Sequence, residues 1–323
     1  MSVRSLPATL ALSATLALSA TLLGAGAPSA FAARPTTYEL AGDPGGSKFE
    51  GIGFDARTKN FYVSETTGGE IHRGRLSSGD AAEWLKGDGT DGRWTARGVT
   101  VDSQGRVYVA GGPNGIDHPG APDLWVYSRD GKLLAALRTG VPGSFLNDIV
   151  IGPDGAAYIT NSNAPQIFWV AEQDGRWTVS TWADATGTIA TAAGFNLGGI
   201  VLSPDRSALV VAQGNVGKLW RFDLRTAKAT AIDTAGADLV NADGLVQQGN
   251  SLWVVRNFSK MLSTLRLSDD GRTARLVAAT PTDPNRVLTT AKLAQGRLLV
   301  VDSKFDEATA APPYQVITLD PQR

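Results

Sequence analysis

Short apolar runs come in pairs along this chain, and each pair follows a polar residue and a small residue. The first copy opens with Glu50-Gly51, continues with an apolar run around Ile52 and returns after a turn with Phe61. Six copies can be aligned, and they begin 45 to 51 residues apart, at Glu50, Arg97, Asn147, Gly198, Asp243 and Thr290. So regular a period predicts a repeat protein in which each repeat is one small β-sheet.

Each copy predicts two consecutive β-strands. The six predicted pairs span residues 50–55 with 61–64, 97–102 with 106–110, 147–151 with 157–160, 198–202 with 208–211, 243–246 with 252–255, and 290–293 with 298–301. Turn residues such as Asp154-Gly155 separate the two strands, because glycine adopts the positive φ angles of tight hairpins. Outer hairpins follow, for example at 124–127, 166–169 and 218–222. Four antiparallel strands in each of six repeats predict an all-β, six-bladed β-propeller.

The last repeat is one strand short. After the pair that ends at residue 301, the segment 314–319 is the one remaining strand candidate before the chain ends. Residues 36–40 precede the first repeat and offer the missing strand. We therefore predict that this N-terminal strand joins the last blade and closes the ring.

The first 32 residues differ from the rest of the chain. Arg4 is the only charged residue before Arg34, and residues 8–23 are rich in Ala, Leu and Ser. Ala30-Phe31-Ala32 has the small-x-small form that signal peptidase reads. This pattern predicts a signal peptide over 1–32 and a single propeller domain over 33–323, secreted to the extracellular space or the periplasm. The alternative is an uncleaved membrane anchor, because the apolar stretch nearly reaches the roughly 18 residues of a spanning helix.

Composition narrows the function classes. The chain has no cysteine, which excludes disulfides and thiolate metal sites. Its 30 Lys and Arg nearly balance 31 Asp and Glu without a basic cluster, which argues against nucleic acid or a membrane as partner. The two histidines, His72 and His118, lie outside the six aligned first positions, so a three-histidine zinc site is excluded. We expect a monomer that acts on a small-molecule substrate.

Candidate chemistry lies at one mouth of the predicted channel. In a propeller the residue before each innermost strand faces this mouth, so the six aligned first positions should converge there. Glu50, Asn147 and Asp243 would bring oxygen donors from three different blades, which is what a hard cation such as Ca²⁺ requires. The ends of the second strands return to the same face, and we predict that they contact substrate through Asn161, Gln213, Asn257 and Asp302.

Three dipeptides that open inner strands carry a resemblance to a known family. Glu50-Gly51, Asn147-Asp148 and Asp243-Gly244 resemble the pattern of the senescence-marker-protein, gluconolactonase and luciferin-regenerating-enzyme family. The resemblance spans about residues 38–320. It implies a six-bladed propeller that binds one divalent cation and hydrolyses lactones. Ca²⁺ is the expected ion, with Zn²⁺ or Mg²⁺ as alternatives.

The same resemblance implies roles for individual residues of this chain. Glu50 and Asp243 would be metal ligands, and Asp243 would also be the catalytic base or nucleophile. Asn147 and Asp148 would contact the metal or the substrate.

Two positions depart from the family's pattern. Gly198-Gly199 stands where the family has an Asn-Gly pair, so a metal ligand is missing unless Asn196, two residues earlier, reaches the ion. Arg97 would point toward the same ring. There it either contacts substrate or pairs with the carboxylates in place of a cation.

Three functions fit these observations. The first is a secreted, metal-dependent hydrolase of the lactonase type that acts on a small lactone or ester. The second is a non-catalytic propeller that binds a ligand or a protein, its channel mouth plugged by a salt link among Arg97, Glu50 and Asp243. The third is a lyase or isomerase for a small metabolite, because a fold does not determine its chemistry.

Overall fold

The structure is a computed structural model of the chain, and it describes residues 1–2, 35–112 and 117–321. Apart from its first two residues, the predicted signal peptide lies outside the described residues. Within the described part, no helix is both long enough and apolar enough to cross a membrane. All strands reported below lie between Thr37 and Leu319.

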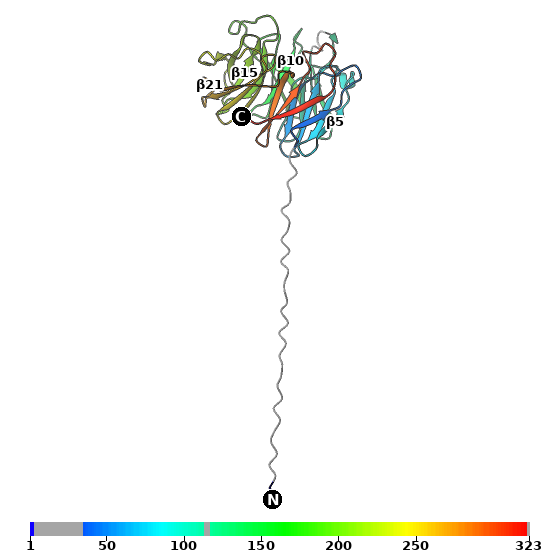
Figure 1. Cartoon of the computed structure of the whole chain (residues 1–323). Coiled ribbons are helices and arrows are strands. Elements are labelled where there is room, and N and C mark those ends of the chain that lie inside the picture. Colours follow the sequence, from blue (N-terminus) through cyan, green and yellow to red (C-terminus); the bar gives the residue numbers. More distant parts are fainter. Residues whose placement is uncertain (3–34, 113–116, 322–323) are drawn as a thin grey trace. The chain divides into compact units, whose positions relative to one another are not determined.

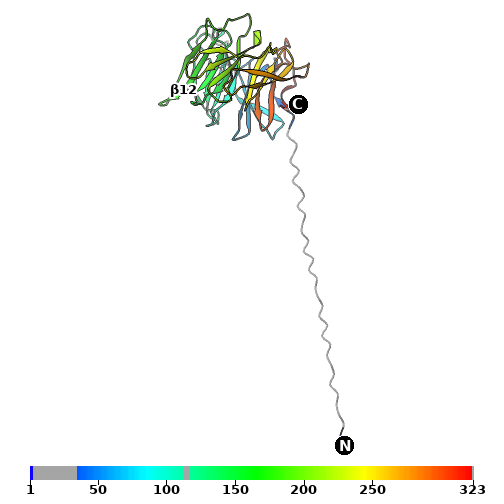
Figure 2. The ribbon, with the colours of Figure 1, turned by 90° about the vertical axis from the view of Figure 1, so that its left-hand side faces the viewer.

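The described residues form an all-β protein, and four of its sheets each contain four antiparallel strands in chain order (Figures 1 and 2). The first of these sheets comprises β6 (Val99–Val101), β7 (Val107–Ala110), β8 (Leu124–Tyr127) and β9 (Leu133–Leu137). The second comprises β10 (Leu146–Ile151), β11 (Ala157–Asn161), β12 (Gln166–Gln173) and β13 (Arg176–Asp184). The third comprises β14 (Leu197–Leu202), β15 (Ala208–Gln213), β16 (Lys218–Asp223) and β17 (Ala229–Ala231). The fourth comprises β18 (Ala242–Gln248), β19 (Ser251–Arg256), β20 (Met261–Leu267) and β21 (Ala274–Pro281).

The fifth sheet has eight strands in the order β2-β3-β4-β5-β1-β24-β23-β22. One half comprises β2 (Phe49–Asp55), β3 (Asn60–Glu65), β4 (Ile71–Arg75) and β5 (Asp80–Leu85). The other half comprises β22 (Leu288–Ala294), β23 (Arg297–Asp302), β24 (Tyr314–Leu319) and β1 (Thr37–Leu40). Two short 3-10 turns, η1 (Thr90–Gly92) and η2 (Gly214–Val216), lie in connections.

The N-terminal strand β1 pairs with the last strand of the chain. It runs antiparallel to β24 over four residue pairs, and the red and blue strands lie side by side in Figure 1. On its other side, β1 makes a parallel pairing of two residues with β5, through Glu39 and Leu40. The predicted pairing of residues 36–40 with the last sheet is therefore confirmed.

The polar and small residues of the sequence repeat lie in a β-bulge at the start of the inner strands. In β2 and β3, Phe49 pairs with Glu65, but the next pair is Ile52 with Val63, so the inner strand carries one extra residue. The same register shift follows the first pair of β10, β14, β18 and β22. Because a bulge re-aims the side chains within it, the first residue of a repeat can leave the regular alternation.

The small residue of the repeat is required by close contacts between neighbouring inner strands. A Cβ on Gly51 would lie 2.0 Å from the carbonyl oxygen of Arg97, and one on Gly98 would lie 2.2 Å from a carbonyl oxygen at the start of β10. The last inner strand also contacts the first, since the Thr289 hydroxyl donates to the Glu50 carbonyl oxygen at 3.0 Å.

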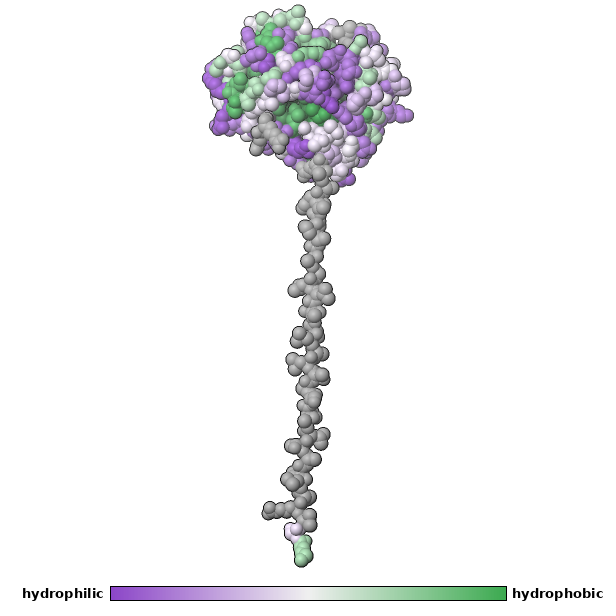
Figure 3. Space-filling view, in the orientation of Figure 1, coloured by the Kyte–Doolittle hydropathy of each residue, from purple (hydrophilic) through white to green (hydrophobic). Residues whose placement is uncertain are grey.

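The apolar core consists of six buried clusters, each shared by two groups of strands. Tyr108 of β7 packs in one cluster with Ile149 of β10, and Phe61 of β3 packs in another with Leu299 of β23. On the face drawn in Figure 3, hydrophilic residues cover much of the surface and hydrophobic patches lie between them. Stacking of small antiparallel sheets through such clusters is consistent with a β-propeller.

Candidate functional site

A cavity of about 560 Å³ lies where the bulged starts of the inner strands meet. Seven residues that the sequence analysis singled out line it together: Glu50, Arg97, Asn147, Asn196, Gly198, Asp243 and Asn257. Thr290, the sixth aligned position, is buried and does not line the cavity. Residues more than 200 positions apart in the chain thus share one site.

Glu50 and Arg97 form an ion pair at the cavity wall. Nη1 of Arg97 lies 2.9 Å from Oε2 of Glu50, and Nε donates to the Gly112 carbonyl oxygen at 2.6 Å. The guanidinium carbon stacks over the Phe145 ring at 3.8 Å from its centre. Burial raises the pKa of the Glu50 carboxyl, and the Arg97 charge offsets this only in part. Arg97 is therefore held by three contacts, and no hydrogen bond from its Nη2 is found among the described residues.

Asp243 is the second carboxylate of the site. Nδ2 of Asn257 donates to its Oδ2 at 2.9 Å, and the Phe258 amide donates to Oδ1 of Asn257 at 2.6 Å, which fixes the orientation of that amide. Burial, and then the nearby Glu50 carboxylate, raise the pKa of Asp243 to about 7. A carboxyl group with this pKa can both accept and release a proton near neutral pH.

Asn147 and Asp243 face one space above Gly198. A Cβ built on Gly198 would lie 3.9 Å from Oδ1 of Asn147 and 4.0 Å from Oδ1 of Asp243. Among the described residues, no hydrogen bond to the Asn147 side chain is found, whereas the backbone amides of Phe145 and Asp148 beside it are both hydrogen-bonded. Two oxygen atoms from different sheets therefore converge on a volume that a side chain at position 198 would fill.

Asp148 lies behind the cavity and does not line it. The backbone amide of Ile149 donates to Oδ1 at 2.8 Å and that of Ile200 to Oδ2 at 3.4 Å. Its negative charge raises the pKa of both Glu50 and Asp243. Asp148 thus acts on the site through its charge and not through contact with a molecule in the cavity.

Two predicted substrate contacts, Asn161 and Asp302, are fully buried and do not line the cavity. Oδ1 of Asn161 accepts a hydrogen bond from the Phe145 amide at 3.0 Å, which holds the end of the loop before β10. Asp302 accepts from Nη1 of Arg286 at 2.8 Å. Contacts within the protein therefore hold Asn161 and Oδ2 of Asp302, whereas Oδ1 of Asp302 has no hydrogen-bond partner within the described residues.

Asn196 and Gln213 are tied to one another and to a local loop. Oδ1 of Asn196 accepts three hydrogen bonds, from the Ala192 amide at 2.9 Å, from Asn215 at 3.0 Å and from Gln213 at 3.1 Å. A carbonyl oxygen with two lone pairs has no capacity left for a cation after that. Gln213 is buried, and its side chain also accepts from an indole N–H. Neither residue can take the ligand or substrate role that the sequence predicted for it in this arrangement.

Four phenylalanines also line the cavity, and the sequence analysis did not find them. They are Phe145, Phe195, Phe258 and Phe305. Phe195 is 60% exposed and Phe258 53% exposed, and the rings of Phe145 and Phe195 lie 4.8 Å apart. Exposed aromatic rings beside a polar centre are typical of a site that binds a partly apolar small molecule.

We compared the chain with protein families, curated sequences and solved structures. No protein-family model and no curated protein sequence matches the chain. Solved structures do match. A gluconolactonase from Xanthomonas campestris has a TM-score of 0.61 and 18% identity, with 88% of each chain covered. The calcium-binding protein regucalcin from Agrobacterium tumefaciens has a TM-score of 0.58 and 20% identity, with 85% of this chain and 92% of that chain covered.

A virginiamycin B lyase from Staphylococcus aureus also matches, with a TM-score of 0.58 and 16% identity over 82% of this chain and 81% of that chain. At these identities the matches concern the fold. The protein therefore has the β-propeller fold of gluconolactonase and regucalcin, and the predicted resemblance to their family is confirmed at the level of the fold.

Proposed function

We propose that this chain is a hydrolase of small lactones or esters that depends on a divalent cation held at the cavity. The observation that carries the proposal is the convergence of Glu50, Asn147 and Asp243 on one cavity with an excess of negative charge. In this proposal the eight-stranded sheet contributes two of six blades, and β1 closes the ring. The predicted signal peptide makes the protein an exported one.

The charges around the cavity fit a divalent cation. In their ionised forms Glu50, Asp148 and Asp243 carry three negative charges, and Arg97 supplies one positive charge, so the set carries −2. Burial makes this excess costly, which is why the pKa values of Glu50 and Asp243 are raised. One divalent cation would neutralise the set.

The donor atoms fit as well. Oδ1 of Asn147 and Oδ1 of Asp243 face the same space, and Arg97 engages only one oxygen of Glu50. Oxygen donors without histidine favour Ca²⁺ over Zn²⁺, and Ca²⁺ accepts water for the remaining positions of its shell. Glu50, Asn147 and Asp243 would hold the ion, and neither histidine of the chain lines the cavity.

The side chains around the site have complementary tasks in this reaction. A divalent cation bound here polarises the carbonyl oxygen of a substrate. Asp243, oriented by Asn257, accepts the proton of the attacking water. Arg97 offers Nη2 to the oxygen on which negative charge develops, and its stacking on Phe145 keeps the guanidinium in place. In the metal-free protein, burial first, then the Glu50 carboxylate and to a smaller extent the Asp148 charge raise the pKa of Asp243.

The aromatic wall indicates the kind of substrate. Phe195 and Phe258 present partly exposed rings to the cavity, and Thr66, Asn215 and Asn241 add polar groups to its lining. We infer that the leaving or acyl part of the substrate is apolar, so that it contacts these rings while the carbonyl group lies at Asp243.

A binding protein with a plugged channel is the second candidate, because Arg97 does pair with Glu50. The plug requires Arg97 to neutralise both carboxylates. Within the described part of the chain, Arg97 makes no ion pair with Asp243, and the pKa of Asp243 stays raised. The geometry therefore favours the hydrolase. A lyase is less well supported: the matched lyase structure is a histidine-to-alanine variant described as catalytically inactive, and no histidine lines the cavity here.

A substrate panel with and without metal tests the proposal. We expect the purified mature protein to hydrolyse lactones or esters with alkyl or aryl groups faster than sugar lactones. Removal of metal with a chelator should lower turnover at least about 100-fold, and added Ca²⁺ should restore it. Hydrolysis that a chelator leaves unchanged would refute the metal dependence. Ca²⁺ binding with no turnover of any ester or lactone would favour the binding protein.

A double substitution at the two unusual positions should strengthen metal binding. Arg97→Ala removes the competing positive charge, and Gly198→Asn places an amide oxygen between Asn147 and Asp243. We expect the Ca²⁺ affinity measured by calorimetry to rise about tenfold or more, equivalent to about 1.4 kcal/mol. Arg97→Ala with Gly198→Ala is the matched control, because it makes the same backbone change without a donor. Equal affinities of the two variants would show that position 198 is not beside the ion.

A further inference from the structure

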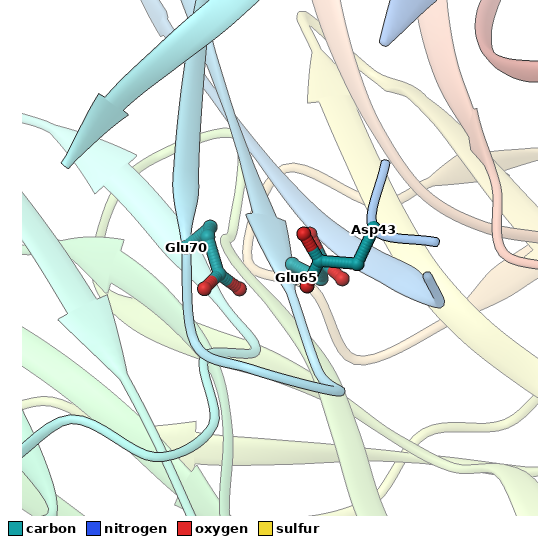
Figure 4. Close-up of side chains that lie close together, drawn as sticks. All are labelled: Asp43, Glu65 and Glu70. Atoms are coloured by element: carbon teal, nitrogen blue, oxygen red, sulfur yellow. The ribbon is translucent and has the colours of Figure 1, made fainter. Parts of the chain in front are cut away.

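A second group of carboxylates lies outside the cavity, near the end of strand β3. Asp43 follows β1, Glu65 ends β3, and Glu70 immediately precedes β4. One carboxylate oxygen from each lies within 4.8 Å of those of the other two. Figure 4 shows the three side chains, which come from three separate segments of the chain. None of the three lines the central cavity.

Glu70 is the unusual member of this group. Glu70 is only 5% exposed, and its Oε2 has no hydrogen-bond partner within the described residues. Two glycines give the carboxylate its space: a Cβ on Gly68 would lie 2.4 Å from Oε2, and one on Gly87 would lie 2.2 Å from Oε1. A buried carboxylate oxygen without a donor is costly unless something compensates it.

The surrounding protein supplies only part of that compensation, through a hydrogen bond from the backbone of Glu70 itself and the charge of nearby Arg93. Glu65 is buried, and its oxygens accept from the Thr67 hydroxyl at 2.5 Å and face Nε2 of His72 at 3.4 Å. Arg93 is the buried cation nearby, but its guanidinium donates to the Gly69 and Lys86 carbonyl oxygens and to a tyrosine hydroxyl. No ion pair joins Arg93 to the three acids in the described part of the chain.

The electrostatic effect of this arrangement is visible in two of the acids. Burial, and then the charge of Glu65, raise the pKa of Glu70 and of Asp43. Asp88 adds a further negative charge to both. The group therefore has more buried negative charge than its neighbours can balance.

We propose that Asp43, Glu65 and Glu70 bind a second divalent cation, Ca²⁺, separate from the ion of the central cavity. All three donors are carboxylate oxygens, which suit a hard cation. Glu70, whose Oε2 has no hydrogen-bond partner within the described residues, supplies a buried carboxylate, and exposed Asp43 lies where the ion would enter. An ion here would join the loop between β1 and β2 to the turn between β3 and β4. Its role is structural, and it does not depend on the hydrolase proposal.

Metal content and melting temperature of single variants test this inference. With both sites filled, the dialysed wild-type protein should contain about two Ca²⁺ per chain. Glu70→Gln should contain one fewer, and added Ca²⁺ should raise its Tm less than it raises that of the wild type. Because the substitution removes a buried, unpartnered charge, Glu70→Gln should also melt higher than the wild type in chelator. Asp43→Asn, at an exposed position, should keep the fold and weaken Ca²⁺ binding about tenfold.

Two further variants separate this site from the central one. Glu83→Gln removes an exposed carboxylate from β5, close to the group but not in it, and should leave the Ca²⁺ content unchanged. Asp243→Asn should remove the other ion only. If Glu70→Gln and Asp43→Asn keep the wild-type Ca²⁺ content and the wild-type response of Tm, the inference is wrong. If Asp243→Asn loses no ion while Glu70→Gln loses one, the second site stands and the metal dependence of the hydrolase fails.

Discussion

Replacement of Asp243 by Asn is expected to reduce kcat for the best ester or lactone about 1,000-fold, while the fold is retained. General-base catalysis contributes about 100- to 10,000-fold in enzymes, and an amide cannot accept the proton. The same substitution removes a ligand of the proposed ion. Turnover at saturating substrate and Ca²⁺ content of the purified variant are the measurements that check this expectation.

The melting temperature of the Asp243 variant is a second measurement, which is independent of its activity. The pKa of Asp243 is raised to about 7 in the folded chain, so ionisation of this group destabilises the metal-free protein. The loss of folding free energy grows as the pH rises from about 4, where Asp243 titrates in the unfolded chain, to about 7, where it titrates in the folded chain. Above about pH 7 the loss does not increase further. In chelator, Asp243→Asn should therefore melt higher than the wild type at pH 8 and nearly equal to it at pH 4.

Asp130→Asn is the matched control for these measurements. Asp130 is an exposed residue in the turn after β8, and its replacement should change neither turnover nor Tm. Asn257→Ala tests the orienting bond to Asp243 and should lower kcat more than it raises KM. Full activity of Asp243→Asn would show that the base lies elsewhere. Loss of activity in Asp130→Asn as well would indicate a general defect and not a catalytic one.

The sequence predicted the positions of the inner strands because the repeat encodes them directly. Four of the six repeats have glycine where the next inner strand approaches, as at Gly51, and these glycines recur at a nearly fixed interval. Glu50, Asn147 and Asp243 occupy equivalent positions of that repeat, so their convergence on one cavity could be predicted from the alignment alone. The β-bulge that turns them was not predicted, because it shows only in the pairing register.

Residues outside the repeat could not be predicted in the same way. Asn196 follows a loop of its own, and the hydrogen bonds that occupy its amide oxygen come from that loop and from a neighbouring turn. Phe195 and Phe258 lie in connections outside the aligned strand pairs, where the repeat does not predict the residue type. Asp43 lies near Glu70 because β1 pairs with β5 of the first repeat as well as with β24. This pairing joins distant parts of the chain, so no local sequence pattern predicts it.

The N-terminal strand β1 makes buried contacts that we expect to stabilise the fold. Tyr38 is 1% exposed, its ring lies 4.9 Å from that of Phe61, and its hydroxyl donates to the Leu76 carbonyl oxygen at 3.1 Å. Leu40 is buried in the same cluster, whereas Glu39 between them faces out. Strand β1 thus joins the last strand to the apolar cluster of the first repeat, and its loss would expose both.

Deletion of residues 34–41 is therefore expected to lower Tm by more than about 10 °C, and Tyr38→Ala alone should approach that value. Loss of a buried aromatic side chain costs about 3–5 kcal/mol, and about 2–4 °C of Tm accompanies each kcal/mol in a domain of this size class. Glu39→Gln changes the outward side of the same strand and should leave Tm within about 2 °C. Thermal melting followed by circular dichroism checks all three variants. An unchanged Tm on deletion would mean that β1 contributes nothing to the closure of the sheet between β24 and β5. A fall of similar size in Glu39→Gln would assign the effect to the outward carboxylate, which accepts a hydrogen bond from Gln315, and not to the buried face of the strand.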